Sequence, residues 1–155
     1  MMAERMSYSR VAPGVSQAMV GLENHVKASD LDPILLDLMR VRVSQLNGCA
    51  FCLDMHSKDL LAAGQSMQRI YMLDTWREAP GYSDRERAAL AWAEAVTLLP
   101  GREVSDEVYA QARAAFSERE LANLTLAVVA INGWNRLNIA FRTPAGTYEP
   151  HRHQS

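Results

Sequence analysis

NGCAFCLDMH, residues 47–56, is the stretch that decides the fold and the chemistry expected of this chain. It holds both cysteines of the protein, Cys49 and Cys52, and a histidine, His56, follows the second cysteine by four residues. If the segment after Gly48 is helical, the three side chains fall at positions i, i+3 and i+7 and share one helix face. Two thiols and an imidazole on one face indicate either redox chemistry or metal binding.

Helices are expected on both sides of this stretch. Asn47-Gly48 is a stop and restart signal between two of them. Ser83 and Ser117 each precede a glutamate by three residues, which is the pattern of a capping box. Apolar periodicity and capping residues predict up to seven helices, over about 11–26, 34–46, 49–63, 66–76, 83–99, 105–116 and 117–138. No strand alternation of useful length appears, so we expect an all-α bundle of five to seven helices.

Length and composition restrict the class of protein. A chain of 155 residues suits a single domain over 1–155, with a core at about 11–142 and an irregular tail over 143–155. The net charge of −2 gives no reason to expect nucleic acid as a partner. The longest apolar run, 124–131, is too short to span a bilayer, and the N-terminus lacks the apolar core of a signal peptide. We therefore expect a cytoplasmic protein with no membrane partner. In that reducing compartment a cysteine pair favours catalysis or metal binding over a structural disulfide.

Two residues compete for the role of nucleophile. A cysteine reacts as its thiolate, and the pKa of a free thiol is about 8.5. The positive end of a helix that starts near Cys49 stabilises an anion, and the Cys52 sulfur should point back toward the free amides there. His56, one turn further on, is placed to accept or share the proton of Cys52. In many Cys-x-x-Cys proteins the first cysteine is the reactive one, but we follow the histidine and assign Cys52.

The spacing of the cysteines permits a two-step redox cycle. Cys52 attacks a peroxide oxygen and becomes a sulfenic acid, and Cys49, one turn away, condenses with it to a disulfide while water leaves. An external dithiol must then reduce the disulfide. The alternatives are cysteines that only pack, or a zinc site formed with His56 and with His25 from another helix. No second cysteine pair completes four zinc ligands, so we expect neither a metal nor a cofactor.

The longer run DLMRVRVSQLNGCAFCLDMH, residues 37–56, resembles the signature of the carboxymuconolactone decarboxylase and alkylhydroperoxidase D superfamily. More narrowly, it is similar to the alkylhydroperoxidase-like branch. Two later runs, AINGWNR at 130–136 and RTP at 142–144, also look like that branch, and the resemblance covers roughly 15–147. It implies an all-helical fold of the alkylhydroperoxidase D-like type and homo-oligomers built as trimers or hexamers.

The resemblance also implies an enzyme, a peroxiredoxin-type alkylhydroperoxidase that reduces a hydroperoxide substrate in antioxidant defence. It implies that Cys52 becomes the sulfenic acid, that Cys49 is its proton donor and resolving partner, and that His56 belongs to a proton relay. Asp37 would supply the carboxylate of the relay, where glutamate is usual. The external dithiol would be a lipoyl-bearing protein. Two alternatives remain open: a non-catalytic oligomeric domain with structural or zinc-binding cysteines, and decarboxylation of a lactone, as in the branch that does not depend on the cysteine pair.

Overall fold

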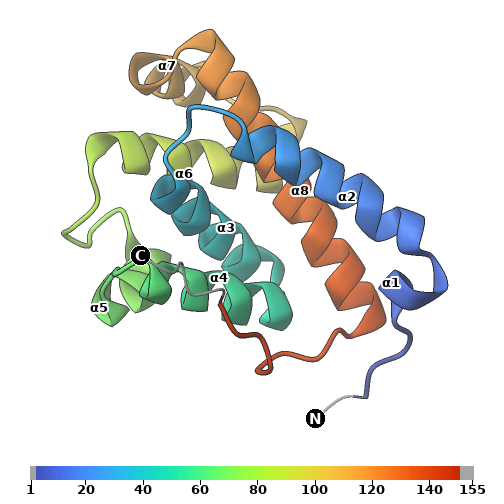
Figure 1. The fold of residues 1–155 in the computed structure, drawn as a ribbon. Helices are drawn as coiled ribbons and strands as arrows, with labels where there is room; N and C mark the ends of the chain where they lie inside the picture. The colour runs from blue at the N-terminus through green and yellow to red at the C-terminus, as the bar shows by residue number, and fades with distance from the viewer. Residues whose placement is uncertain (1–2, 151–155) are drawn as a thin grey trace.

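The computed structural model describes residues 3–150, which contain helices and their connections and no strand (Figure 1). The helices, in chain order, are α1 (Tyr8–Val11), α2 (Pro13–Lys27), α3 (Pro33–Asn47), α4 (Ala50–Ala62), α5 (Met67–Tyr71), the 3-10 helix η1 (Met72–Thr75), α6 (Asp84–Leu98), the 3-10 helix η2 (Pro100–Arg102), α7 (Asp106–Ala115) and α8 (Glu118–Phe141). The all-α prediction is confirmed. Each predicted helix has a counterpart, the segment over 66–76 is divided into α5 and η1, and α1 is an additional single turn.

Side-chain caps fix where the helices begin. The carboxylate of Asp32 accepts a backbone hydrogen bond at 2.8 Å, and Pro33 occupies the first turn of α3. Ser83 and Ser117 each form a complete capping box with the glutamate three residues on. Caps of this kind contribute about 1 kcal/mol each, and they are coded within a few residues.

Gly48 sets the position of the cysteines relative to α3. Its backbone is left-handed, with φ 72° and ψ 33°, a conformation that glycine adopts without steric cost. Cys49 follows as the N-cap of α4, so the chain reverses direction between the two helices. As a result α3 and α4 pack against each other, and residues of α3 lie beside the cysteine segment.

The central helix is α3, which contacts α4, α6 and α8 (Figure 1). Buried apolar residues form two clusters around it. The larger cluster contains Cys49 and Cys52 together with residues of α3, α6 and α8. The second cluster includes Leu38, Leu60 and Trp76. The cysteines therefore belong to the packed core rather than to a surface loop.

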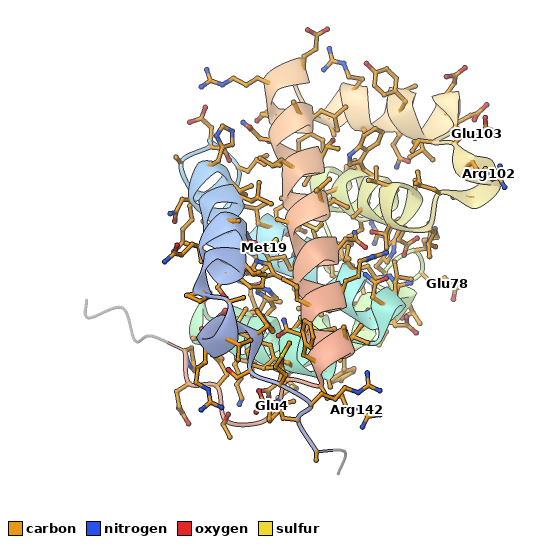
Figure 2. The ribbon with its side chains drawn as sticks, turned by 90° about the vertical axis from the view of Figure 1, so that its right-hand side faces the viewer. Glu4, Met19, Glu78, Arg102, Glu103 and Arg142 are labelled. Atoms are coloured by element: carbon orange, nitrogen blue, oxygen red, sulfur yellow. A yellow bond between two sulfur atoms is a disulfide. The ribbon has the colours of Figure 1, made fainter. Side chains whose placement is uncertain are left out.

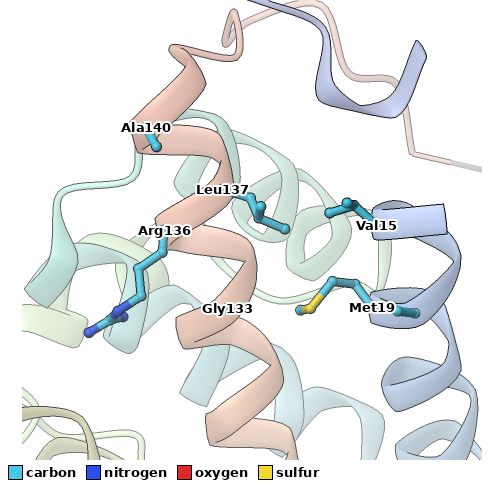
Figure 3. A pocket seen from close by; sticks show the side chains of 7 residues that line it. Val15, Met19, Gly133, Arg136, Leu137 and Ala140 are labelled. Carbon is cyan, nitrogen blue, oxygen red and sulfur yellow. The ribbon is translucent and has the colours of Figure 1, made fainter. Parts of the chain in front are cut away.

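Gly133 on α8 lies against the Met19 side chain of α2. A Cβ atom at this position would lie 2.8 Å from the Cε of Met19, which Figures 2 and 3 show on the side of α2 that faces α8. Val15, Met19, Gly133 and Leu137 contribute to a shallow apolar groove of about 540 Å³ between these helices (Figure 3). A larger residue at position 133 would displace the flexible end of the Met19 side chain.

The segment after α8 contains no helix over 143–150, and it lies along α4. The Nζ of Lys58 donates to the carbonyl oxygens of Gly146 at 3.2 Å and Tyr148 at 2.9 Å, and the Tyr148 hydroxyl donates to Asp59 at 2.7 Å. The rest of the predicted tail, 151–155, lies outside the described residues. Within residues 3–150, no helix has the length and apolar character needed to cross a membrane.

Candidate active site at the cysteine pair

Cys49 and Cys52 are joined as a disulfide at the start of α4, with their Cα atoms 5.4 Å apart. Each is only 1% exposed. The Cys49 sulfur accepts a hydrogen bond from the backbone amide of Cys52 at 3.3 Å. The sequence led us to expect free amides of the helix start facing the Cys52 sulfur, and the structure differs. Cys49 is itself the N-cap, with an extended backbone that turns its side chain over the first helical turn, whereas Cys52 is already inside the helix.

His56 lies one turn after Cys52 on α4 and is 7% exposed. Its Nδ1 faces two carboxylates, with Asp37 Oδ1 at 3.4 Å and Asp59 Oδ2 at 3.9 Å. Neither distance is that of a good hydrogen bond, and Nδ1 has no hydrogen-bond partner among the described residues. Asp37 therefore approaches His56 without forming a hydrogen bond to it. The four residues selected from the sequence lie together, on the adjoining helices α3 and α4 and the turn between them.

The charge of Asp37 is fixed by its surroundings. Burial acts to raise the pKa of this carboxyl group, but His56 and the Arg40 guanidinium outweigh burial, and the net pKa lies below its ordinary value. Arg40 donates to Asp37 at 3.0 Å and to Glu23 at 2.6 Å. Among the described residues, Asp37 makes its polar contacts with Arg40 and His56. No hydrogen bond among the described residues joins it directly to either sulfur.

The lowered pKa of Asp37 predicts a pH-dependent contribution to stability. A carboxyl group whose pKa is lower in the folded state stabilises the fold above its unfolded pKa of about 3.9, and this contribution is lost as pH falls through the folded pKa. Asp37→Asn should lower the free energy of unfolding by about 1 to 2 kcal/mol at neutral pH, and the difference from the parent should shrink below about pH 4. Urea unfolding at neutral and acidic pH measures both values.

Asp30→Asn is the matched control, because Asp30 is exposed and forms no ion pair within residues 3–150. It should leave the free energy of unfolding nearly unchanged at both pH values. A penalty for Asp37→Asn that stays the same at neutral and acidic pH would contradict the assignment of an ionised, paired Asp37.

Asn138 also touches the site, and no sequence signal singled it out. Its Nδ2 lies 3.5 Å from the Cys52 sulfur, although 86 residues separate the two in the chain. The run AINGWNR ends at residue 136, two residues earlier. Ile131, Asn135 and Asn138 follow the helical period and are all buried. Extending that period past the run would have placed Asn138 on the inward face of α8.

His25, considered from the sequence as a zinc ligand, is engaged elsewhere. Its Nε2 shares a hydrogen bond of 3.1 Å with the side chain of Asn123. Across residues 3–150, no three His, Cys, Asp or Glu side chains are grouped so that they could hold a metal ion.

The fold and the site define an all-helical protein in which a buried Cys-x-x-Cys pair lies beside a histidine and a carboxylate. The profile of the Carboxymuconolactone decarboxylase family matches residues 13–95. The chain belongs to the superfamily of carboxymuconolactone decarboxylase and alkylhydroperoxidase D. The family resemblance inferred from the cysteine motif is thereby confirmed.

Relatives of known sequence or structure extend over most of the chain. The uncharacterized protein YdfG of Bacillus subtilis (strain 168) is 40% identical over 146 residues, which cover 94% of this chain and 99% of YdfG. A protein of unknown function from Agrobacterium tumefaciens, with a suggested role as the antioxidant defence protein AhpD, has a TM-score of 0.89 and 38% identity, covering 94% of this chain and 100% of that one. The debrominase Bmp8, solved with 2,3,4-tribromopyrrole, has a TM-score of 0.77 at 20% identity, covering 88% and 73%. Because that likeness concerns the fold alone, the reaction must be argued from the site.

Proposed function

We propose that this protein is a thiol-dependent hydroperoxide reductase that uses Cys49 and Cys52 as its redox pair. The observation that carries the proposal is the pair of sulfur atoms at disulfide distance, one turn from His56 and its ionised neighbour Asp37. Two thiols that form one disulfide release two electrons, which is the number needed to cleave an O–O bond. The suggested antioxidant role of the Agrobacterium tumefaciens protein supports the same reaction.

The first half of the cycle oxidises Cys52. His56 takes the proton of the Cys52 thiol, and Asp37 stabilises the imidazolium that results. The thiolate attacks the terminal oxygen of the hydroperoxide, so that an S–O bond forms and the O–O bond breaks. Cys52 becomes a sulfenic acid, and the alkoxide that leaves takes the proton from His56 and departs as an alcohol.

The second half restores the thiols. The Cys49 sulfur attacks the sulfenic sulfur of Cys52, an S–S bond forms, and hydroxide leaves with the Cys49 proton as water. An external dithiol then donates two electrons and two protons, and both cysteines return to thiols. We propose a lipoyl-bearing protein as this dithiol, and the cytoplasm as the compartment that keeps it reduced.

Burial places a condition on this cycle. Both cysteines are almost fully shielded from solvent, and neither lines the apolar groove between α2 and α8. A hydroperoxide can therefore reach Cys52 only when the surrounding helices open transiently. A closed core is also where thiols that merely pack would lie, so a direct measurement of activity must separate the two functions.

Treatment of the fully reduced protein with cumene hydroperoxide tests the proposal. We expect loss of both thiols with consumption of one molecule of peroxide per chain, and an intramolecular disulfide between Cys49 and Cys52 by peptide mass. Addition of dihydrolipoamide, a dithiol, should restore the thiols and allow repeated turnover. The variant with both cysteines replaced by serine serves as the blank. Recovery of both free thiols after peroxide treatment would overturn the proposed function.

We also propose that the chain forms a homo-oligomer, a trimer or a hexamer. Apolar side chains remain exposed on the two helices that border the groove, among them Val20 on α2 and Val129 and Ile139 on α8. Exposed apolar side chains beside an apolar groove are compatible with protein–protein contact. A second copy of the chain would cover it.

A further inference from the structure

Only one side-chain donor among the described residues forms a hydrogen bond to the Cys52 sulfur, and it comes from α8. The Nδ2 of Asn138 lies 3.5 Å from this sulfur, and Asn138 is 4% exposed. The free amide at the start of α4 is instead directed at Cys49. The hydrogen bond from Asn138 is therefore the local feature of the structure that distinguishes Cys52 from Cys49.

The orientation of the Asn138 amide is determined by its other contacts. Its Nδ2 also donates to the backbone carbonyl of Trp134 at 2.9 Å, and a carbonyl oxygen can only accept. Its Oδ1 accepts a hydrogen bond from the Tyr8 hydroxyl at 3.2 Å. Rotating the amide by half a turn would place Oδ1 against the Trp134 carbonyl and remove both hydrogen bonds of the NH2 group. The NH2 group must therefore face the sulfur.

Tyr8 is held in place by the end of α8. The backbone amide of Arg5 donates to the carbonyl of Phe141 at 3.0 Å, and the Arg5 guanidinium donates to the carbonyl of Ala140 at 2.9 Å. The rings of Tyr8 and Phe141 pack with their centroids 5.6 Å apart. Burial raises the pKa of Tyr8, so its hydroxyl stays protonated and remains a donor. The N-terminal segment thus anchors the group that orients Asn138.

We propose that Asn138 is a further catalytic residue of this site, which donates a hydrogen bond to the anionic sulfur of Cys52, and that Tyr8 is its positioning residue. This inference rests on the hydroperoxide-reducing function proposed above. A neutral NH2 donor stabilises a thiolate more strongly than a thiol, because hydrogen bonds to charged acceptors are roughly twice as strong. The donor acts on Cys52 before attack, when the sulfur must carry its negative charge.

The proposal also accounts for the choice between the two cysteines. The free amide of the helix start favours an anion at Cys49, which is the usual arrangement in Cys-x-x-Cys proteins. Asn138 and His56 act on Cys52 instead. A side chain on a helix far along the sequence would thus decide which sulfur attacks.

The charge of Cys52 can be measured without peroxide. In the reduced Cys49→Ser protein, Cys52 is the only thiol, and thiolate absorbance in the ultraviolet follows its ionisation as pH rises. Subtracting the same titration of the variant lacking both cysteines removes the contribution of the tyrosines. The other titratable groups around the site are His56 and Asp59 on α4, Asp37 on α3 and Tyr8 on α1. All of them except Tyr8, which one variant replaces, are common to every protein compared.

In this background, Asn138→Ala should raise the midpoint of the Cys52 titration by about one pH unit, roughly a ten-fold change in the thiol–thiolate equilibrium. Asn138→Asp keeps the shape of the side chain and replaces the donor with a like charge, so its shift should be larger. Tyr8→Phe keeps the ring contact with Phe141 and should shift the midpoint in the same direction by less. Asn135→Ala is the matched control, because Asn135 is also buried on α8 but bonds Ser44 and Asn47 rather than a sulfur.

Each outcome of this titration bears on the proposal. An unchanged midpoint in Asn138→Asp would overturn it, and so would equal shifts in Asn138→Ala and Asn135→Ala, which would show a general loss of packing. The result is separable from that of the peroxide assay. The midpoint of the Cys52 titration could shift only in the Asn138 and Tyr8 variants while the parent protein consumes no peroxide. That combination would support the role of the Asn138 hydrogen bond and reject the proposed function.

Discussion

Cys52→Ser is expected to reduce hydroperoxide consumption by at least about 1,000-fold, because it removes the attacking atom. A serine hydroxyl is un-ionised at neutral pH and forms neither a sulfenic acid nor a disulfide. Cys52 is the cysteine that has Asn138 at 3.5 Å and His56 one turn away. Treatment with peroxide in the presence of dimedone, which captures sulfenic acids, should therefore label the parent protein transiently and Cys52→Ser not at all.

Cys49→Ser is the matched variant. Serine is a good N-cap residue, so it preserves the capping role that Cys49 has at the start of α4. Without a resolving thiol, the sulfenic acid on Cys52 should persist, and the dimedone adduct should accumulate after a single turnover. An adduct in Cys52→Ser and none in Cys49→Ser would make Cys49 the nucleophile. That outcome has a physical basis, because Cys49 receives the free amide of the helix.

The helical order is predictable from the sequence because each helix start is coded locally. Ser83, Ser117 and Gly48 act within three residues of themselves, and the structure uses them as the sequence predicts. The division of the segment over 66–76 is not local. Leu73 and Trp76 are both buried in the second core cluster, and a 3-10 turn places residues three apart on the same side. Tertiary packing therefore decided this element.

The site likewise combines features that are coded locally with contacts that form only when distant segments pack together. The spacing of Cys49, Cys52 and His56 follows from one helix, so it can be read directly from the sequence. Asp37 required a family resemblance, because it contacts His56 only after α3 and α4 fold together. Asn138 depends on how α8 packs across α4, which no local pattern encodes. Contacts between segments that are distant in the sequence are thus the features of the site that local sequence patterns do not predict.

Glu94 on α6 also makes contacts between segments that are distant in the sequence. It links α6 to α3, the helix that carries Asp37. Glu94 is 7% exposed, and its Oε1 accepts hydrogen bonds from Arg42 at 2.6 Å and from the Trp76 indole at 2.8 Å. Its Oε2 pairs with Arg77 at 2.6 Å. Burial acts to raise the pKa of Glu94, but these hydrogen bonds outweigh it and the pKa lies below its ordinary value. The side chain is therefore a buried, ionised and fully bonded carboxylate.

Glu94→Ala is expected to lower the free energy of unfolding by about 3 to 5 kcal/mol. The variant leaves the Arg42 charge and the Trp76 N–H buried without their common acceptor, and the cost of these unpaired groups exceeds the worth of the original contact. Arg42 keeps its contacts with Gln45 and Asp74, which places the expected loss toward the lower end of that range. Urea unfolding monitored by tryptophan fluorescence and by circular dichroism measures the change.

Two control variants separate burial from charge. Glu118→Ala removes an exposed pair with Arg113, whose atoms lie 3.6 Å apart, and should cost less than about 1 kcal/mol. Glu94→Gln keeps the volume and one acceptor oxygen but not the charge, so its loss should fall between the two alanine variants. If Glu94→Ala proves no more destabilising than Glu118→Ala, Glu94 cannot be the desolvated partner of Arg42. Apolar packing alone would then have to stabilise the contact between α6 and α3.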